Sequence, residues 1–170
     1  MANFDFTGIT SIAHKALAPL SVAATTFEVT TAMIDNADDN IFTSIVLPSD
    51  VRLIELDIYS DDLDSNASPT LAYNIGLAYT GIGRGQVGKV TTDIISATCI
   101  GTAVTVGQAA NTTGGKLQFE ASDIANVNKE LWELGGLTAD TGGYYSIVLD
   151  LTTAAATPVA GTITIVAKYV

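Results

Sequence analysis

The chain has 170 residues, which is enough for one domain with a substantial core. Charged residues make up only 15% of it, and seven basic residues against eighteen acidic ones give a formal net charge of −11. The basic residues are scattered from Lys15 to Lys168, whereas nucleic-acid binding needs Lys and Arg concentrated on one surface to displace counterions from phosphates. Direct binding of DNA or RNA is therefore not expected.

The composition also limits the chemistry that the chain can carry. Cys99 is the only cysteine and His14 the only histidine, so an intrachain disulfide, a zinc site and a Cys–His nucleophile pair all lack the residues that they require. Residues 94–115 are uncharged and long enough to cross a bilayer, but Ser, Thr, Gly, Asn and Gln interrupt them. Asp5 precedes every basic residue and Lys15 breaks the apolar run, which is unlike a signal peptide. We expect a soluble protein made without export, with no cofactor and no membrane partner.

The first 24 residues differ from the rest of the sequence. Apolar side chains recur there at helical spacing, and the stripe includes Ile9, Ile12, Leu17 and Leu20. The segment is either a short amphipathic helix or an extended arm lying on a neighbouring subunit. Because such a stripe has little place in a sandwich, we expect these four residues to form an interface. Residues 25–170 are expected to form a single β-sandwich domain.

The segments after residue 24 alternate apolar and polar side chains with the period of two that indicates strands. Clusters of Asp, Asn, Ser and Pro separate them, and these residues favour turns. Four strands are expected in the first half of this region, at 25–31, 41–47, 51–60 and 71–79.

The second half is less regular. Residues 81–88 contain four glycines and are expected to form a loop, and residues 90–106 predict one or two strands, or a short helix with a strand. Residues 116–120 predict a brief strand, and 128–134 about two helical turns between Asn128 and the pair Gly135–Gly136. The clearest strands come last. They are expected at 144–151 and 162–169, with Pro158 and Gly161 breaking the pattern between them.

Seven or eight short strands with turn residues between them favour an all-β fold, an antiparallel β-sandwich with one or two short helices. The helices that a parallel α/β sheet needs between its strands are missing. Alternation along the strands predicts a core that contains Ile54, Leu56, Ile58, Ile147, Leu149, Ile163 and Ile165.

One glycine-rich stretch resembles a nucleotide-binding loop. Gly83, Gly85 and Gly88 match G-x-G-x-x-G, and Gly83 to Lys89 nearly matches G-x-x-x-x-G-K-[ST]. Val90 stands where the magnesium-binding hydroxyl belongs, and no amphipathic helix clearly follows to direct its N-terminus at a phosphate. We interpret the stretch as a surface loop.

Acidic residues in two loops raise the possibility of a cation site. Asp62-x-Asp64-x-Asn66 begins like a calcium-binding loop, but Ala67 replaces the glycine of the sharp turn and Tyr73 replaces the bidentate Glu. A second loop offers Asp35, Asp38 and Asp39 as oxygen ligands. We interpret both loops as solvated turns rather than metal sites.

No catalytic constellation is evident. Glu55 and Asp57 share a strand face, but no nucleophile accompanies them, so an acid–base pair is not favoured. Trp132 is interpreted as a core or interface anchor rather than a sugar platform. We therefore expect a protein that is not an enzyme.

Several stretches together resemble the small β-sandwich structural proteins of tailed bacteriophage virions, of the capsid decoration or cement type. They are Leu47-Pro-Ser-Asp-Val-Arg-Leu-Ile-Glu-Leu-Asp-Ile-Tyr59 with the strand from Leu71 to Leu77, Leu131-Trp-Glu-Leu-Gly-Gly-Leu-Thr-Ala-Asp140, and the ending from Thr152 to Tyr169. They cover about half of the chain, mostly after residue 47. The first 24 residues and the loop at Gly81 match nothing in that family.

This resemblance implies a jelly-roll-like sandwich that binds the outside of the head lattice, with the major capsid protein or other virion proteins as partners. It implies a homo-oligomer, often a trimer, on the capsid exterior after assembly in the host cytoplasm. Its role would be mechanical, bridging capsid subunits against the pressure of packaged DNA. A neck, tail or fibre-attachment component is the nearest alternative, and a carbohydrate- or receptor-binding sandwich is another.

Overall fold

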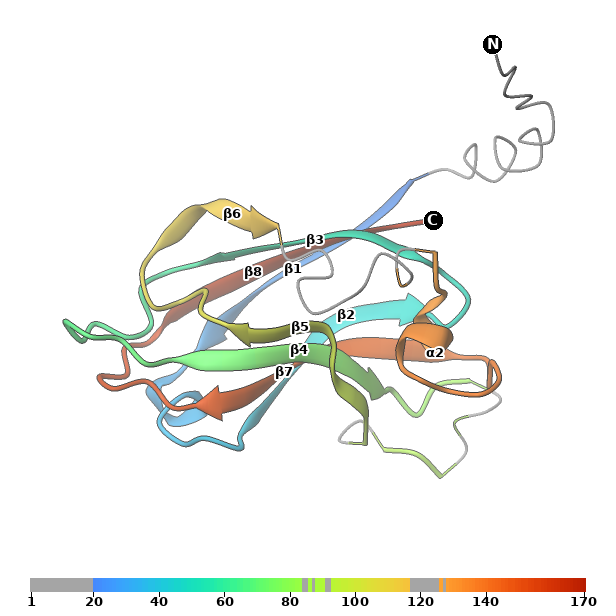
Figure 1. Ribbon diagram of the computed structural model, residues 1–170, viewed down its shortest axis with the longest axis horizontal. Helices are drawn as coiled ribbons and strands as arrows, with labels where there is room; N and C mark the ends of the chain where they lie inside the picture. Colours follow the sequence, from blue (N-terminus) through green and yellow to red (C-terminus); the bar gives the residue numbers. More distant parts are fainter. Residues whose placement is uncertain (1–19, 84–85, 87, 91–92, 117–125, 127) are drawn as a thin grey trace, which may run out of the picture.

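Two four-stranded antiparallel sheets pack against each other in the computed structural model (Figure 1). It describes residues 20–83, 86, 88–90, 93–116, 126 and 128–170. The strands are β1 (Ser21–Val29), β2 (Asn40–Pro48), β3 (Leu53–Ser60), β4 (Ala72–Tyr79), β5 (Ile94–Val104), β6 (Asn111–Lys116), β7 (Tyr144–Thr153) and β8 (Gly161–Tyr169). A 3-10 turn, η2 (Thr31–Met33), and a single-turn helix, α2 (Leu131–Leu134), complete the described elements.

The strand order follows one rule. One sheet has the order β1-β8-β3-β6 and the other β2-β7-β4-β5, so the first strand pairs with the last, the second with the seventh, and so on inward to β4 and β5. The chain is thus a nested set of antiparallel pairs rolled into two layers, which is the jelly-roll arrangement. The predicted fold class is confirmed.

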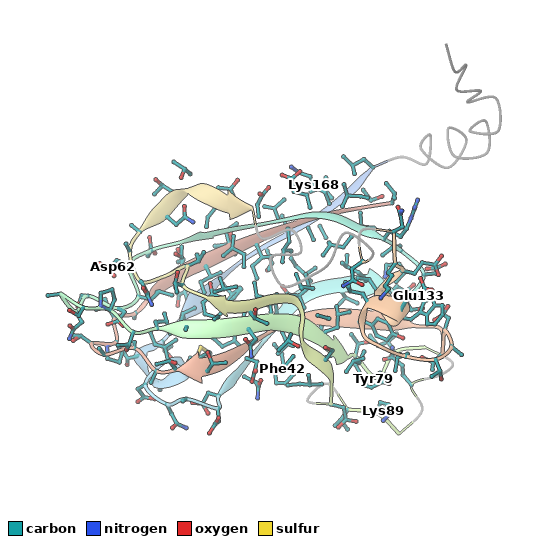
Figure 2. All side chains as sticks on the ribbon, viewed as in Figure 1. Phe42, Asp62, Tyr79, Lys89, Glu133 and Lys168 are labelled. Atoms are coloured by element: carbon teal, nitrogen blue, oxygen red, sulfur yellow. The ribbon has the colours of Figure 1, made fainter. Side chains whose placement is uncertain are left out.

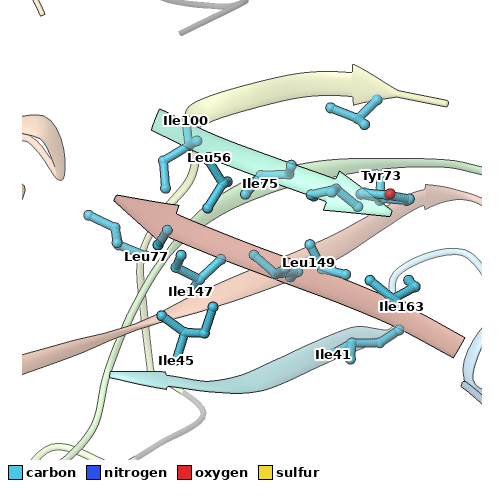
Figure 3. Packing of buried hydrophobic residues seen from close by; sticks show 14 of the residues in the cluster. Ile41, Ile45, Leu56, Tyr73, Ile75, Leu77, Ile100, Ile147, Leu149 and Ile163 are labelled. Carbon is cyan, nitrogen blue, oxygen red and sulfur yellow. The ribbon is translucent and has the colours of Figure 1, made fainter. Parts of the chain in front are cut away.

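The core lies between the sheets, and most of its predicted members are confirmed. Figure 3 shows side chains from both layers meeting there. Six of the seven predicted residues are buried: Leu56, Ile58, Ile147, Leu149, Ile163 and Ile165. The exception is Ile54, because Leu53 pairs with Tyr169 and Glu55 with Lys168, which leaves Ile54 as an extra residue in a β-bulge. Leu53 is buried in its place.

Two elements begin at residues other than those predicted. β1 starts at Ser21, four residues before the predicted strand, and runs to Val29 without a register shift against β8. α2 is one turn rather than the predicted two, because the residue that precedes it is Glu130, not Asn128. The side chains of Glu130 and Glu133 form a reciprocal capping box there. Gly136, with a φ of 80°, follows the helix as predicted.

The antiparallel order divides the connections between two ends of the sandwich. One end, which we call the tip, carries the β1–β2, β3–β4, β5–β6 and β7–β8 connections. The opposite end carries the other connections, the start of β1 and the end of β8 (Figure 1). In the part of the chain that the structure describes, no helix is long and apolar enough to cross a membrane.

Candidate interaction surfaces

The carboxylate of Asp64 ties two loops together at the tip. Its Oδ2 accepts hydrogen bonds from the backbone N–H groups of Thr70 (2.7 Å), Leu71 (3.1 Å) and Ala156 (3.0 Å). Its Oδ1 accepts one from the N–H of Thr157 (2.8 Å). The side chain is buried, so all four donors are satisfied away from water by one charged group. The β3–β4 and β7–β8 connections are thereby held as one unit.

The pKa of the Asp64 carboxyl group follows from these contacts. Burial alone would raise its pKa, but the four backbone hydrogen bonds, that from Thr157 first, lower the pKa to about 2. The carboxylate stays ionised at neutral pH, and backbone donors occupy both of its oxygens. Neighbouring Asp62 accepts the N–H of Asp64 in a local turn, and Figure 2 shows Asp62 at the tip. The acidic loop that resembled a calcium site is therefore a structural latch between two loops.

The second acidic loop gives no cation site either. Among the described residues, no group of three or more His, Cys, Asp or Glu side chains is close enough to hold a metal ion. This includes Asp35, Asp38 and Asp39, which the sequence placed in one loop.

The glycine-rich loop is organised by a residue that the motif does not contain. Gln86 is completely buried, and its Oε1 accepts the N–H of Thr80 (3.0 Å) while its Nε2 donates to the carbonyl of Tyr144 (2.7 Å). Lys89 Nζ lies 4.8 Å from the centre of the Tyr79 ring, a cation–π distance (Figure 2). The next described element after this loop is strand β5, not the α-helix that follows a phosphate-binding loop. Gln86 is the one long, uncharged polar side chain in this loop, and that was the only hint in the sequence that it organises the loop.

The outer face of the β1-β8-β3-β6 sheet has a charge cluster in place of an acid–base pair. Lys168 Nζ lies 3.0 Å from Glu55 Oε1 and 3.6 Å from Asp57 Oδ2. The pKa of Lys168 is raised, chiefly by its hydrogen bond to Glu55 and further by the charges of both carboxylates. One ammonium group lies between two carboxylates and attracts both, which suits a structural role.

Two aromatic side chains among the described residues bear on glycan binding, Trp132 and Tyr59. Trp132 is half-buried against the core, and its Nε1 donates to Glu130 Oε2 (2.8 Å). A shallow polar hollow on the outer sheet face contains Tyr59 beside Asp61 and Asn111, far along the sandwich from α2. Tyr59 is the one aromatic residue among the described residues that line it.

Exposed apolar side chains occur where the chain enters the sandwich. Leu20 is 55% exposed and Val22 is 58% exposed, which is high for such residues in a folded protein. Leu20 belongs to the apolar stripe predicted as an interface. Its other members, Ile9, Ile12 and Leu17, lie outside the described residues.

Cys99 is chemically quiet. Its side chain packs against the core, and burial raises the pKa of its thiol to about 11. Little thiolate forms at neutral pH, so the residue behaves as a small hydrophobe. His14 lies outside the described residues.

Comparisons with known proteins address this fold directly. No protein-family profile matches the sequence, and no curated protein matches it either. A chain of the cyanophage Pam1 capsid asymmetric unit superposes with a TM-score of 0.59 at 20% identity, over 88% of this chain and 83% of that chain. A chain of the capsid of Ralstonia phage GP4 gives a TM-score of 0.60 at 22% identity, over 88% and 84%.

This is a fold of phage capsids. Both similar structures come from phage capsids, so the resemblance to β-sandwich proteins of phage virions is confirmed at the level of the fold. The structural match covers 88% of this chain in each comparison.

Proposed function

We propose that the protein is a structural, non-enzymatic component of a tailed-phage virion, and more closely a decoration protein bound to the outside of the head. The observation that carries this proposal is the fold that the chain shares, over 88% of its length, with chains of two phage capsids. The absence of a reactive constellation among the described residues is consistent with a mechanical role. Asp64, Gln86 and the group around Lys168 all hold the fold together.

The charge of the protein favours the exterior of a capsid. A net charge of −11 is repelled by packaged DNA, whose phosphates are also negative. On the outer surface this repulsion is weakest. The proposed partners are the major capsid protein or other virion proteins, and assembly takes place in the host cytoplasm.

Self-association belongs to the same proposal. The sequence is rich in Thr, Ala and Gly and poor in charge, so backbones can approach closely across an interface. We assign the contact to the N-terminal stripe of Ile9, Ile12, Leu17 and Leu20, and the preferred state is a homotrimer. Leu20, which is exposed, supports this assignment.

The test is binding of the purified protein to heads that lack it, measured by cosedimentation and by electron microscopy of a labelled chain. We expect saturable binding and label spread over the outer lattice. The double variant Ile9→Asp/Leu17→Asp should lose most of this binding, whereas Ser11→Asp, in the same segment but on the helical face opposite the stripe, should retain it.

Other outcomes would refute particular parts of the proposal. Label confined to one vertex or to the tail would show a neck, tail or fibre-attachment component. Binding to glycans that Tyr59→Ala abolishes would show a receptor-binding sandwich that uses the hollow on the outer sheet face. Equal binding by the stripe variant and its control would show that the stripe is not the contact.

A further inference from the structure

Strand β1 is an edge of its sheet. It pairs with β8 on one side, and no other described strand pairs with it. In an antiparallel pair, every second residue directs its N–H and C=O groups away from the partner strand. Between Val22 and Val29, none of these outward backbone groups has a hydrogen bond to another described segment. The strand therefore presents a row of backbone donors and acceptors that no described segment uses.

Proteins usually protect such an edge, but β1 has little protection beyond one side-chain hydrogen bond to β2, between Thr25 Oγ1 and Ser44 Oγ (2.6 Å). Lysine, proline, a bulge or a short strand normally prevents further pairing. β1 has nine residues in continuous register, no proline and no lysine, and its one charged residue is Glu28. Its exposed side chains Val22, Ala24 and Thr26 are small and uncharged. Such a strand is a template for β-strand addition.

The occupant of this edge must satisfy an electrostatic condition. A strand from another copy approaches a chain whose net charge is −11. Residues 1–19 contain one acidic and one basic residue, Asp5 and Lys15, so this segment is neutral and the remaining residues carry the whole net charge. A neutral segment can approach the edge without the repulsion that an acidic one would meet.

Length and position favour the same segment. Residues 1–19 directly precede Leu20 and β1. Nineteen extended residues span roughly 60 Å, whereas a nine-residue strand spans roughly 30 Å. The segment is thus long enough to leave its own sandwich and still pair along a complete edge of another.

We propose that residues 1–19 of one copy add as a strand to the outer edge of β1 in a neighbouring copy. The inference rests on the proposed self-association and specifies where it occurs. The contact is heterologous, with the arm of one copy on the edge of the next, and it gives a ring, such as a trimer, where the rotation between successive copies closes. Every copy then both donates an arm and protects an edge.

Disulfide trapping between two different full-length variants tests the proposal. One chain carries Thr10→Cys or Ser11→Cys, adjacent positions that cover both faces of an added strand, and the other carries Ala24→Cys on the exposed face of β1. A disulfide requires Cα atoms about 4.4–6.8 Å apart, so it reports direct pairing. Native Cys99 remains in every chain, and the unsubstituted protein is the blank.

We expect the mixed chains to form an interchain disulfide at least about tenfold more than the same arm variant mixed with Thr102→Cys, because pairing raises the local thiol concentration to the millimolar range. Thr102 is an exposed residue of β5, on the opposite edge of the other sheet. The experiment is run on protein in solution and on protein bound to heads.

Three results would overturn the proposal. A disulfide formed within a double variant but not between mixed chains would show that the arm folds back on its own β1. Efficient dimers of Ala24→Cys alone would show that two β1 edges pair with each other. An interchain disulfide yield no higher than that of the Thr102→Cys mixture, both in solution and on heads, would show that the arm does not pair with this edge. If the protein still bound heads normally, the proposed function would stand without this contact.

Discussion

Asp64 is one charged side chain that adds to a short backbone bridge between two connections at the tip, where Asp64 pairs with Pro158. Its four backbone donors come from two connections that are about ninety residues apart in the sequence. If the carboxylate is lost, several N–H groups remain buried without an acceptor, and each such group costs about 1–3 kcal/mol. Asp64 is therefore expected to contribute strongly to the stability of the tip, beside the backbone bonds of Ser65 to Thr157 and Val159 to Leu63.

The first prediction is that Asp64→Asn destabilises the protein by about 2–4 kcal/mol at pH 7, because the amide retains one acceptor oxygen and directs N–H groups at other donors. Asp62→Asn, which alters a single local turn, is the control and should cost less than about 1 kcal/mol. Urea unfolding measures both. Similar losses in the two variants would show that the latch contributes little.

Acid titration gives a second prediction at the same residue. The folded-state pKa of about 2 lies below the ordinary 3.8, so the contribution of Asp64 is complete above about pH 5 and is lost as the pH falls through 4 toward 2. The difference in unfolding free energy between wild type and Asp64→Asn should shrink over this window by about 2 kcal/mol. A difference that is constant from pH 6 to pH 2 would contradict the assignment.

Tyr73 provides a residue-scale prediction of the opposite sign. Its ring is buried in the core, its hydroxyl has no hydrogen-bond partner among the described residues, and burial raises its pKa. Tyr73→Phe should therefore stabilise the protein by about 1 kcal/mol in thermal or urea unfolding. Tyr145→Phe is the matched control, because its hydroxyl lies 3.3 Å from Thr141 Oγ1, and it should be neutral or destabilising.

At the scale of elements, β5 departs most from regular strand geometry. Ile75 of β4 pairs with Gly101 and Leu77 pairs with Ser96, so four residues of β5 lie opposite Gly76 alone. The bulged backbone passes directly over Gly76, and a methyl group there would overlap the carbonyl oxygen of Ser96. The glycine is what allows the two strands to lie this close.

Gly76→Ala should therefore cost about 3 kcal/mol or more in urea unfolding, since backbone atoms cannot move aside as side chains can. The control is Gly101→Ala, whose new methyl group would meet side chains rather than backbone, Val104 at 3.1 Å and Ile75 at 3.7 Å, and should cost less than about 1 kcal/mol. Equal costs would show that β5 shifts freely over β4.

Sequence alone predicted the strands whose alternation is regular and missed the features that depend on a partner strand. Ile147, Leu149, Ile163 and Ile165 were assigned correctly because period two continues unbroken through β7 and β8. Ile54 was misplaced because the bulge in β3 is defined by its pairing with β8. The Asp64 latch and the Gln86 contacts join residues distant in the chain, and no local pattern encodes them.

At the scale of the whole molecule, net charge and assembly oppose each other. Copies that each carry −11 repel, and salt screens this repulsion over about 10 Å at 0.1 M. Raising NaCl from about 20 mM to about 500 mM should therefore strengthen self-association, on the order of tenfold by analytical ultracentrifugation. Weaker association at high salt would instead indicate an interface held by ion pairs.

The pairing of β1 with β8 also determines how the protein responds to a pulling force. Both strands have an end at the same end of the sandwich, with Ser21 opposite Tyr169. A force applied between residues 20 and 169 opens their ladder from that end, one pair at a time. A force applied at residue 20 and resisted at the tip, where Asp64 anchors the loops, acts along β1 and loads all nine pairs together. The second geometry should rupture at a higher force in single-molecule pulling, so the sandwich is mechanically strong in one direction and weak in the other.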